Sequence, residues 1–143
     1  MERSLVLVKP DAVERGFSGA IIERLESAGL TLVALKMLRM DQALAERHYA
    51  PHKEKPFFKG LISFITSGPI VAAVFVGDDA VRTARNVMGA TDPAKAEPGS
   101  IRRDFGLDIE RNAVHGSDSV KTAEHEVKLY FKDSEIMSYE RKQ

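Results

Sequence analysis

The sequence predicts a small α/β or α+β sandwich, in which one sheet is covered by helices. Two short apolar runs, at 4–8 and 70–76, are rich in β-branched residues and bounded by Pro or Gly, which is typical of strands buried on both faces. Segments with helical apolar spacing separate these runs. Such alternation of strands and helices gives a layered fold, and by itself it favours a parallel sheet.

Apolar spacing and the positions of Gly and Pro also predict the elements between the two buried strands. A helix is expected in GAIIERLESAG at 19–29, where Gly29 is placed to end it. The next strand, TLVALKMLRM at 31–40, becomes alternating towards its end, which indicates a longer strand or one nearer the sheet edge. A helix pair follows, and its second member is expected to begin near Pro56 and end at Gly68.

Two more helices are expected in the second half of the chain. The first lies in DDAVRTARNVMG at 78–89, with Asp78 or Asp79 as its N-cap. The second follows a short apolar segment at 113–114. The apolar stripe of that last helix predicts buried positions at Val120, Ala123, Val127, Tyr130 and Phe131.

Length and composition predict one globular domain over residues 1–143. Basic and acidic residues balance to a net charge of zero, which argues against a sequence-independent hold on nucleic acid. The absence of cysteine excludes disulfides and thiolate chemistry and fits a reducing compartment. No apolar run suits a secretory signal or a membrane span, so we expect a cytoplasmic protein with neither a membrane nor a specific nucleic-acid partner.

One segment does not fit the pattern. GATDPAKAEPGSIRRDFG at 89–106 has no periodic apolar face and holds the adjacent pair Arg102 and Arg103. Long loops without secondary structure are uncommon in compact domains and are often functional.

His115 is the candidate reactive side chain, within NAVHGSD at 112–118. Gly116 lets backbone approach a ligand, and Ser117 or Asp118 could cap the following helix, whose N-terminus favours anions. An ordinary turn histidine fits the same residues. His48 and His52 are one helical turn apart, but the intervening Pro51 disfavours a shared metal site. His125 lies among lysines and is expected on a solvated helix face.

Any phosphate site must be built from side chains, because the chain has neither a GxxxxGK[ST] loop nor a GxGxxG loop. Lys9 directly follows the first buried strand, at a place where small sheets often bind ligands. The other candidate cations are Arg82, Arg85, Arg102 and Arg103. Lysine and arginine can clamp phosphate oxygens, which is most of what phosphoryl transfer requires.

Taken together, these residues resemble the nucleoside diphosphate kinases along essentially the whole chain. The resemblance is carried by NAVHGSD at 112–118, LVLVKPDAVERG at 5–16, HYAPHKEKPFFKGLISFITSGP at 48–69 and GATDPAKAEPGSIRRDF at 89–105. It implies one kinase domain over 1–143 with a ferredoxin-like βαββαβ core, an antiparallel sheet covered by helices. That differs from the parallel sheet favoured by alternation alone.

The resemblance also assigns roles to individual residues. It implies that His115 is phosphorylated on Nδ1, the pros nitrogen, that Glu126 orients the other ring nitrogen, and that Ser117 is a neighbouring hydroxyl. It implies contacts to phosphates and ribose from Lys9, Tyr49, Arg85, Thr91, Arg102 and Asn112, and a base clamp of Phe57 and Ile109. By helical angle alone Glu124 lies slightly nearer the apolar stripe than Glu126, so periodicity does not choose between them.

The implied reaction is ping-pong transfer of the γ-phosphate of a nucleoside triphosphate such as ATP to a nucleoside diphosphate. Mg²⁺ is implied as a cofactor carried by the nucleotide phosphates, with no protein side chains as ligands. A homo-oligomer is implied, and because the sequence stops soon after Tyr139, tetramer and hexamer both stay open. The alternatives are a non-catalytic regulatory or nucleic-acid-binding relative, which intact His115 argues against, and a different phosphohistidine enzyme.

Overall fold

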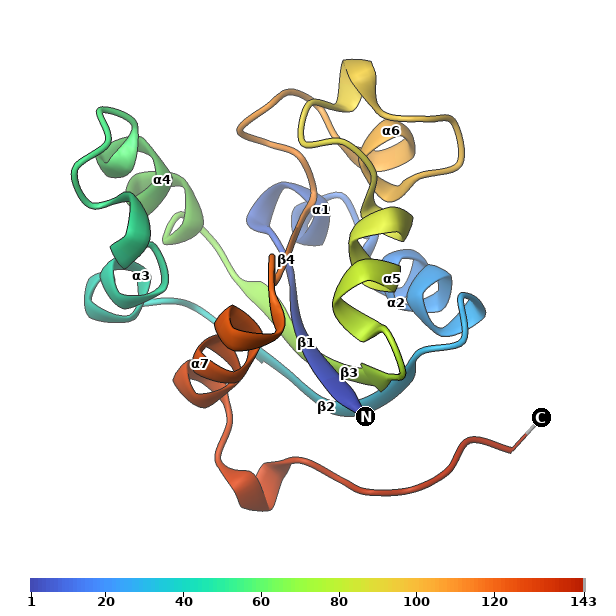
Figure 1. Cartoon of the computed structure of the whole chain (residues 1–143). Coiled ribbons are helices and arrows are strands. Elements are labelled where there is room, and N and C mark those ends of the chain that lie inside the picture. Colours follow the sequence, from blue (N-terminus) through green and yellow to red (C-terminus); the bar gives the residue numbers. More distant parts are fainter. Residues whose placement is uncertain (143) are drawn as a thin grey trace.

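A computed structural model describes residues 1–142 and shows a four-stranded sheet flanked by helices (Figure 1). The elements are β1 Glu2–Val8, α1 Pro10–Glu14, α2 Ser18–Ser27, β2 Thr31–Leu38, α3 Gln42–His48, η1 Ala50–His52, α4 Phe58–Ile65, β3 Ile70–Gly77, α5 Ala80–Met88, η2 Pro93–Lys95, α6 Ile101–Phe105, β4 Val114–Gly116, α7 Val120–Tyr130 and η3 Asp133–Glu135.

The sheet has the strand order β2-β3-β1-β4, and every neighbouring pair is antiparallel. The α+β, ferredoxin-like expectation is therefore confirmed, and the parallel sheet favoured by alternation is wrong. The reason is topological. β1 and β2 run in the same direction, as do β3 and β4, but an oppositely directed strand lies between the members of each pair. Alternation alone predicted one direction for all four strands, whereas the chain reverses between β2 and β3 across the helix pair α3 and α4.

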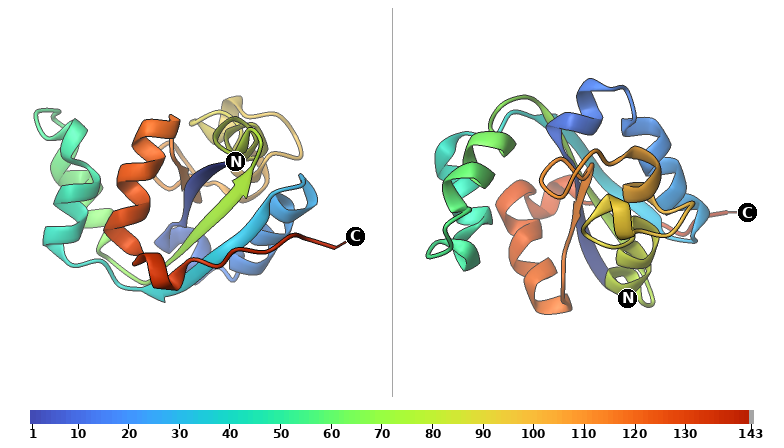
Figure 2. Two further views of the ribbon diagram at one scale, coloured as in Figure 1. Left: turned by 60° about the horizontal axis from the view of Figure 1, so that its bottom comes forward. Right: turned by 90° about the horizontal axis from the view of Figure 1, so that it is seen from above.

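Apolar side chains fill both faces of the sheet. Along β1, Val6 and Val8 pack into the core beneath α1, α2 and α5, whereas Leu5 and Leu7 pack into the core beneath α3, α4 and α7. The two sets of helices lie on opposite sides of the sheet in Figure 2. Because both faces are covered, β1 and β3 carry continuous apolar runs instead of an alternating pattern, as predicted.

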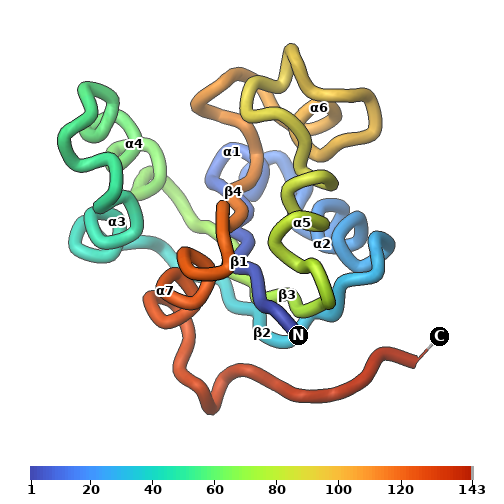
Figure 3. Tube along the Cα trace, in the orientation of Figure 1, coloured from blue at the N-terminus to red at the C-terminus, as the bar shows by residue number. Residues whose placement is uncertain are grey.

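β2 is an edge strand, as its alternating end indicated. Leu35 and Met37 are 51% and 64% exposed there. After η3 the chain runs back along this edge (Figure 3), and the amide of Met137 donates to the carbonyl of Val33 over 2.8 Å. None of the helices in the described part of the chain has the length and apolar character needed to span a bilayer.

Helix starts account for most of the local corrections. α7 is capped by Ser119, whose Oγ accepts from the amide of Thr122 over 3.0 Å, so the expected cap at Ser117 or Asp118 is wrong. Val120 is 47% exposed, because it stands at the first helical position and faces outward, whereas the other four predicted positions are buried. Asp79 is at the N-cap position of α5 without a capping hydrogen bond. Glu2 from β1 accepts from the Val81 amide there instead, over 2.9 Å.

The irregular segment 89–106 has local structure of its own. It contains η2 and the short helix α6, which Ser100 caps by accepting from the amide of Arg103. α6 has only five residues, too few to show a helical apolar period, so the sequence predicts a loop over the whole segment. The segment is held to α2 by Arg24, whose guanidinium donates to Asp104 over 2.6 Å.

Candidate functional site

A cavity of about 890 Å³ opens at the end of the sheet where β1 finishes and β4 begins. Its walls come from α3, η1 and α4 on one side and from α5 and the segment after it on the other. Of the residues assigned by resemblance, ten line this cavity: Lys9, Tyr49, Phe57, Arg85, Thr91, Arg102, Ile109, Asn112, His115 and Glu126. The sequence blocks from which they come, far apart along the chain, therefore meet in one place.

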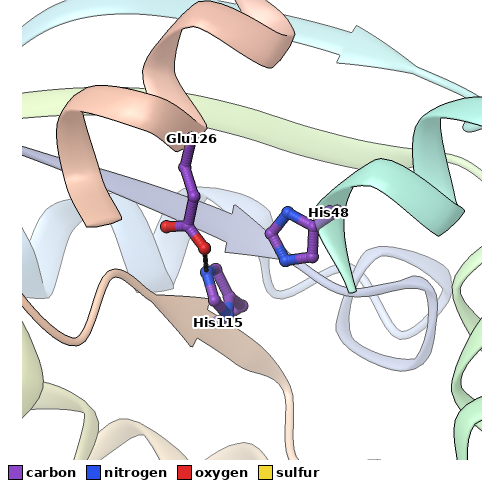
Figure 4. Close-up of side chains that lie close together, drawn as sticks. All are labelled: His48, His115 and Glu126. Atoms are coloured by element: carbon purple, nitrogen blue, oxygen red, sulfur yellow. Dashed lines mark hydrogen bonds and ion pairs between the residues drawn. The ribbon is translucent and has the colours of Figure 1, made fainter. Parts of the chain in front are cut away.

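His115 sits on β4, paired with Leu7 of β1, and its side chain is 23% exposed. Its Nε2 lies 3.0 Å from Oε2 of Glu126, on α7 (Figure 4). The other ring nitrogen, Nδ1, is turned away from this carboxylate. Since an ionised carboxylate can only accept, Nε2 carries the proton and Nδ1 keeps a free lone pair.

Glu126 is held from both of its oxygens. Ser117 Oγ donates to Oε1 over 2.6 Å and itself accepts from the amide of Leu5 over 3.1 Å. Burial raises the pKa of the Glu126 carboxyl, but hydrogen bonds from His115 and Ser117 more than offset this, so its pKa lies below the ordinary value. Ser117 does not line the cavity. It is fully buried behind Glu126, where it fixes the carboxylate.

Lys9 and Asn112 form the floor of the cavity beside β1. Lys9 Nζ donates to Asn112 Oδ1 over 2.9 Å, and Asn112 Nδ2 donates to the carbonyl of Thr91 over 3.0 Å. Burial, and then the positive charge of Arg102, lower the pKa of Lys9 to about 8. A cation stripped of water in this way gains more from an incoming anion than an exposed lysine would.

Arg102 is a second cation of the floor and is only 7% exposed. It donates to the carbonyls of Gly89 and Val114, each over 3.0 Å, while its Nε is buried without a partner among residues 1–142. Burial, and then the charge of Arg85, lower its pKa to about 10. Lys9, Arg85 and Arg102 thus bring three positive charges to one cavity, which forms a site for negative charge.

The mouth of the cavity is apolar and exposed. Phe57, at the N-cap of α4, is 52% exposed, and Ile109 is 64% exposed. Tyr49 lies deeper in the cavity, and its burial raises the pKa of its hydroxyl.

Arg82 and Arg103, two further candidate cations, are outside this cavity. Arg82 pairs with Asp79 at 3.6 Å, and Arg103 donates to the carbonyl of Ala94.

His48 is a site residue that the sequence analysis missed. Its ring packs edge-on against His115 at a centroid distance of 4.5 Å, and its Nδ1 lies 2.9 Å from the hydroxyl of Tyr130. Burial, and then the nearby His115, lower the pKa of His48 to about 3, so it is neutral at physiological pH. A usable signal existed, because His48 follows the apolar Ala45 by three positions and so shares the buried face of α3.

His48, His115 and Glu126 could together contribute metal ligands, since one donor atom of each lies within 4.8 Å of the others. A metal ion between His115 and Glu126 would have to replace their 3.0 Å hydrogen bond, which already uses Nε2 and Oε2. The trio is therefore better described as an oriented histidine with a carboxylate and an aromatic neighbour.

Known proteins match this chain along almost its whole length. The family model described as nucleoside diphosphate kinase matches residues 2–136. The chain belongs to the nucleoside diphosphate kinase family. A nucleoside diphosphate kinase of Dehalococcoides mccartyi (strain ATCC BAA-2266 / KCTC 15142 / 195) is 58% identical over 142 residues, which cover 99% of this chain and 100% of the relative. One from Archaeoglobus fulgidus is 55% identical, over 99% of this chain and 93% of the relative.

Solved structures of nucleoside diphosphate kinases share the fold. That of Halobacterium salinarum, in complex with CDP, superposes with a TM-score of 0.95 at 51% identity, over 98% of this chain and 93% of the other. That of Aquifex aeolicus gives a TM-score of 0.93 at 44% identity, over 95% of this chain and 99% of the other. This chain therefore has the fold of nucleoside diphosphate kinases, as the resemblance implied.

Proposed function

We propose that this chain is a nucleoside diphosphate kinase that moves the γ-phosphate of ATP, or another nucleoside triphosphate, to a nucleoside diphosphate through a phosphohistidine on Nδ1 of His115. The observation that carries this proposal is the His115–Glu126 pair, which leaves Nδ1 unprotonated and open to the cavity. One domain over residues 1–143 would hold the entire site.

In the first half-reaction, the Nδ1 lone pair attacks the γ-phosphorus. The new N–P bond forms as the bond from the γ-phosphorus to the bridging oxygen breaks, and the nucleoside diphosphate leaves with that oxygen. The imidazole then bears positive charge, which Glu126 stabilises through the Nε2–H hydrogen bond. In the second half-reaction, a terminal phosphate oxygen of the acceptor diphosphate attacks, and the N–P bond breaks.

The remaining residues of the site divide between phosphates and nucleoside. Lys9, Arg85 and Arg102 would hold the phosphate oxygens, while Tyr49, Thr91 and Asn112 would complete the polar contacts to phosphate and ribose. Phe57 and Ile109 would clamp the base by apolar contact without reading its edge, which suits acceptance of many bases. Donor and acceptor have the same form, so one cavity serves both in turn, as ping-pong kinetics require.

Mg²⁺ bound to the nucleotide phosphates would offset their negative charge. The carboxylates that line the cavity are Glu110, Asp118 and Glu126, and Glu126 has both oxygens hydrogen-bonded. Glu110 and Asp118 are exposed and free to accept from metal-bound water, whereas the phosphates would provide the direct ligands. We further propose a cytoplasmic homo-oligomer, tetramer or hexamer.

The test is incubation with ATP labelled in the γ-phosphate. The parent protein should acquire an alkali-stable, acid-labile label that GDP discharges, and His115→Ala should acquire none. His125→Ala is the matched control, because His125 lies on the exposed side of α7 and outside the cavity, and it should label as the parent does. An unlabelled parent, or a labelled His115→Ala, would mean a non-catalytic relative or a different nucleophile.

A further inference from the structure

Ala113 adopts an uncommon backbone conformation two residues before His115. Its φ is 77°, and within residues 1–142 every other positive φ belongs to glycine. Residues with a Cβ disfavour this left-handed region because Cβ approaches the following carbonyl. Ala113 is also fully buried, so the neighbouring structure has to maintain the conformation.

Two groups that follow β1 hold both ends of Ala113. The carboxylate of Asp11, on α1, accepts from the Ala113 amide at Oδ2 over 3.0 Å. The amide of Lys9 donates to the carbonyl of Ala113 over 2.8 Å. The turn that leads into β4 is thereby fixed against the end of β1.

Asp11 is a costly residue to keep at this position. It is 6% exposed, its Oδ1 has no hydrogen-bond partner among the described residues, and burial raises the pKa of its carboxyl. Burying a carboxylate lowers the stability of the fold unless hydrogen bonds or an opposite charge compensate for the lost hydration. Such a residue is therefore a candidate for a functional role. Asp11 is not among the residues that line the cavity, so it would not contact a substrate bound there.

The turn that Asp11 holds determines where two site residues lie. Asn112, directly before Ala113, bridges Lys9 Nζ and the carbonyl of Thr91. His115 is in the middle of β4, which has only three residues paired with β1. So short a ladder depends on contacts at its two ends. Ser117 bonds to Leu5 just after β4, and the turn at Ala113 fixes the chain just before it.

We propose that Asp11 is a positioning residue, whose carboxylate holds the Ala113 amide and thereby sets Asn112 and His115 against Lys9 for phosphoryl transfer. This inference rests on the function proposed for His115. Asp11 touches neither substrate nor reacting atoms. Its carboxylate accepts from the backbone of residue 113, and its negative charge also lies near Lys9. A glycine at 113 should reduce the need for the hydrogen bond, since glycine adopts positive φ without strain.

The test compares Asp11→Ala, Asp11→Asn and the double variant Asp11→Ala/Ala113→Gly in single-turnover labelling of His115 by γ-labelled ATP. We expect Asp11→Ala to slow labelling at saturating ATP on the order of a hundredfold, as misplacement of reacting groups by about 1 Å does. Asp11→Asn, which keeps a neutral acceptor, should fall between Asp11→Ala and the parent. Adding Ala113→Gly to Asp11→Ala should restore most of the rate. Asp78→Asn, an exposed position outside the cavity, is the control for removal of a carboxylate.

Two results would overturn the proposal: Asp11→Ala labelling at the parental rate, or an Asp11→Ala loss that Asp11→Asn shares in full and Ala113→Gly does not relieve. The second would mean that the charge of Asp11 acts directly. If Asp11→Ala does not fold, Asp11→Asn is compared with Asp11→Asn/Ala113→Gly, and the absence of any gain from glycine overturns the proposal.

Hydrogen exchange at the Ala113 amide separates this inference from the proposed function, because it needs no phosphorylation. The amide should exchange faster in Asp11→Ala, which removes the acceptor, than in the parent. A parent that takes no label refutes the proposed function. A labelled parent with unchanged amide exchange in Asp11→Ala refutes only the role of Asp11.

Discussion

The floor of the cavity and its mouth are held in opposite ways. At the floor, Lys9, Asn112 and Glu126 are each at most 8% exposed and are fixed by hydrogen bonds to other site residues. At the mouth, Phe57 and Ile109 are more than half exposed. The floor is thus held by buried polar contacts, whereas the two residues that would clamp the base at the mouth are apolar and exposed.

This difference matches the two demands on the proposed enzyme. Transfer of a phosphoryl group needs charges and a nucleophile in place before the reaction, because reorganising them during the reaction would raise the barrier. Acceptance of different bases needs the reverse, since each hydrogen bond to a base edge would exclude the bases that lack the partner. Substitutions at the floor should therefore damage chemistry, and those at the mouth should damage binding.

The largest effect is expected from Glu126→Gln. The glutamine amide can donate to Nε2 of His115 and so favour the tautomer with the proton on Nδ1, where the attacking lone pair is needed. We expect the labelling rate of His115 to fall on the order of a hundredfold to ten-thousandfold, the usual contribution of a positioned acid or base. Single-turnover labelling measures it.

Glu124→Gln is the matched control, on the same helix two residues earlier. Glu124 is bonded to Arg3 over 2.6 Å in a partly exposed ion pair, a type that contributes about 0–1 kcal/mol to stability. Its labelling rate should equal that of the parent. Equal losses in the two variants would contradict the assignment of Glu126 as the carboxylate that orients His115.

The pair Glu124 and Glu126 also shows what the sequence could provide. Apolar periodicity placed α7 and most of its buried face, but both glutamates border that face. The choice depends on where β4 brings His115, a tertiary fact without a local signal. Recognition of the family motif supplied the answer, and the geometry agrees with it.

In the fold as well, some features follow from local sequence patterns and others depend on tertiary contacts. The buried strands, the edge character of β2 and most of the predicted helices follow from local patterns. Strand adjacency does not, because one alternation of elements fits a parallel sheet or an antiparallel one. His48 and Asp11 were missed for a related reason: both are polar residues buried by partners more than 80 positions away in sequence, His48 by Tyr130 and Asp11 by Ala113.

An intermediate effect is expected from His48→Phe, which keeps an aromatic ring beside His115 but leaves the Tyr130 hydroxyl without its nitrogen partner. The loss of a buried partner costs about 1–3 kcal/mol. In the parent, burial and then the nearby His115 lower the pKa of His48 from its ordinary value of 6.5 to about 3. The unfolded state therefore binds more protons between these values, and stability falls as pH drops from 6.5 towards 3.

His48→Phe should remove that dependence, which approaches about 1.4 kcal/mol per pH unit for one residue. Urea unfolding at one protein concentration, at several pH values from 7.5 down to 5, measures it. His125→Phe, at an exposed histidine, should keep the parental slope. A parental slope in His48→Phe would show that His48 is not the buried neutral histidine described here.

The smallest effect is expected at the mouth, from Phe57→Ala. A stacked base contributes about 1–3 kcal/mol, and the half-exposed ring of Phe57 should lie at the lower end, so the ATP concentration for half-maximal labelling should rise about tenfold. The labelling rate at saturating ATP should change far less, because the Phe57 ring lies beside His52 at the mouth, whereas His115 is oriented by Glu126. Met137→Ala, an exposed apolar position outside the cavity, is the control. If Phe57→Ala lowers the saturating rate as strongly as it weakens binding, floor and mouth are not separate, and Phe57 helps to place the phosphates as well as the base.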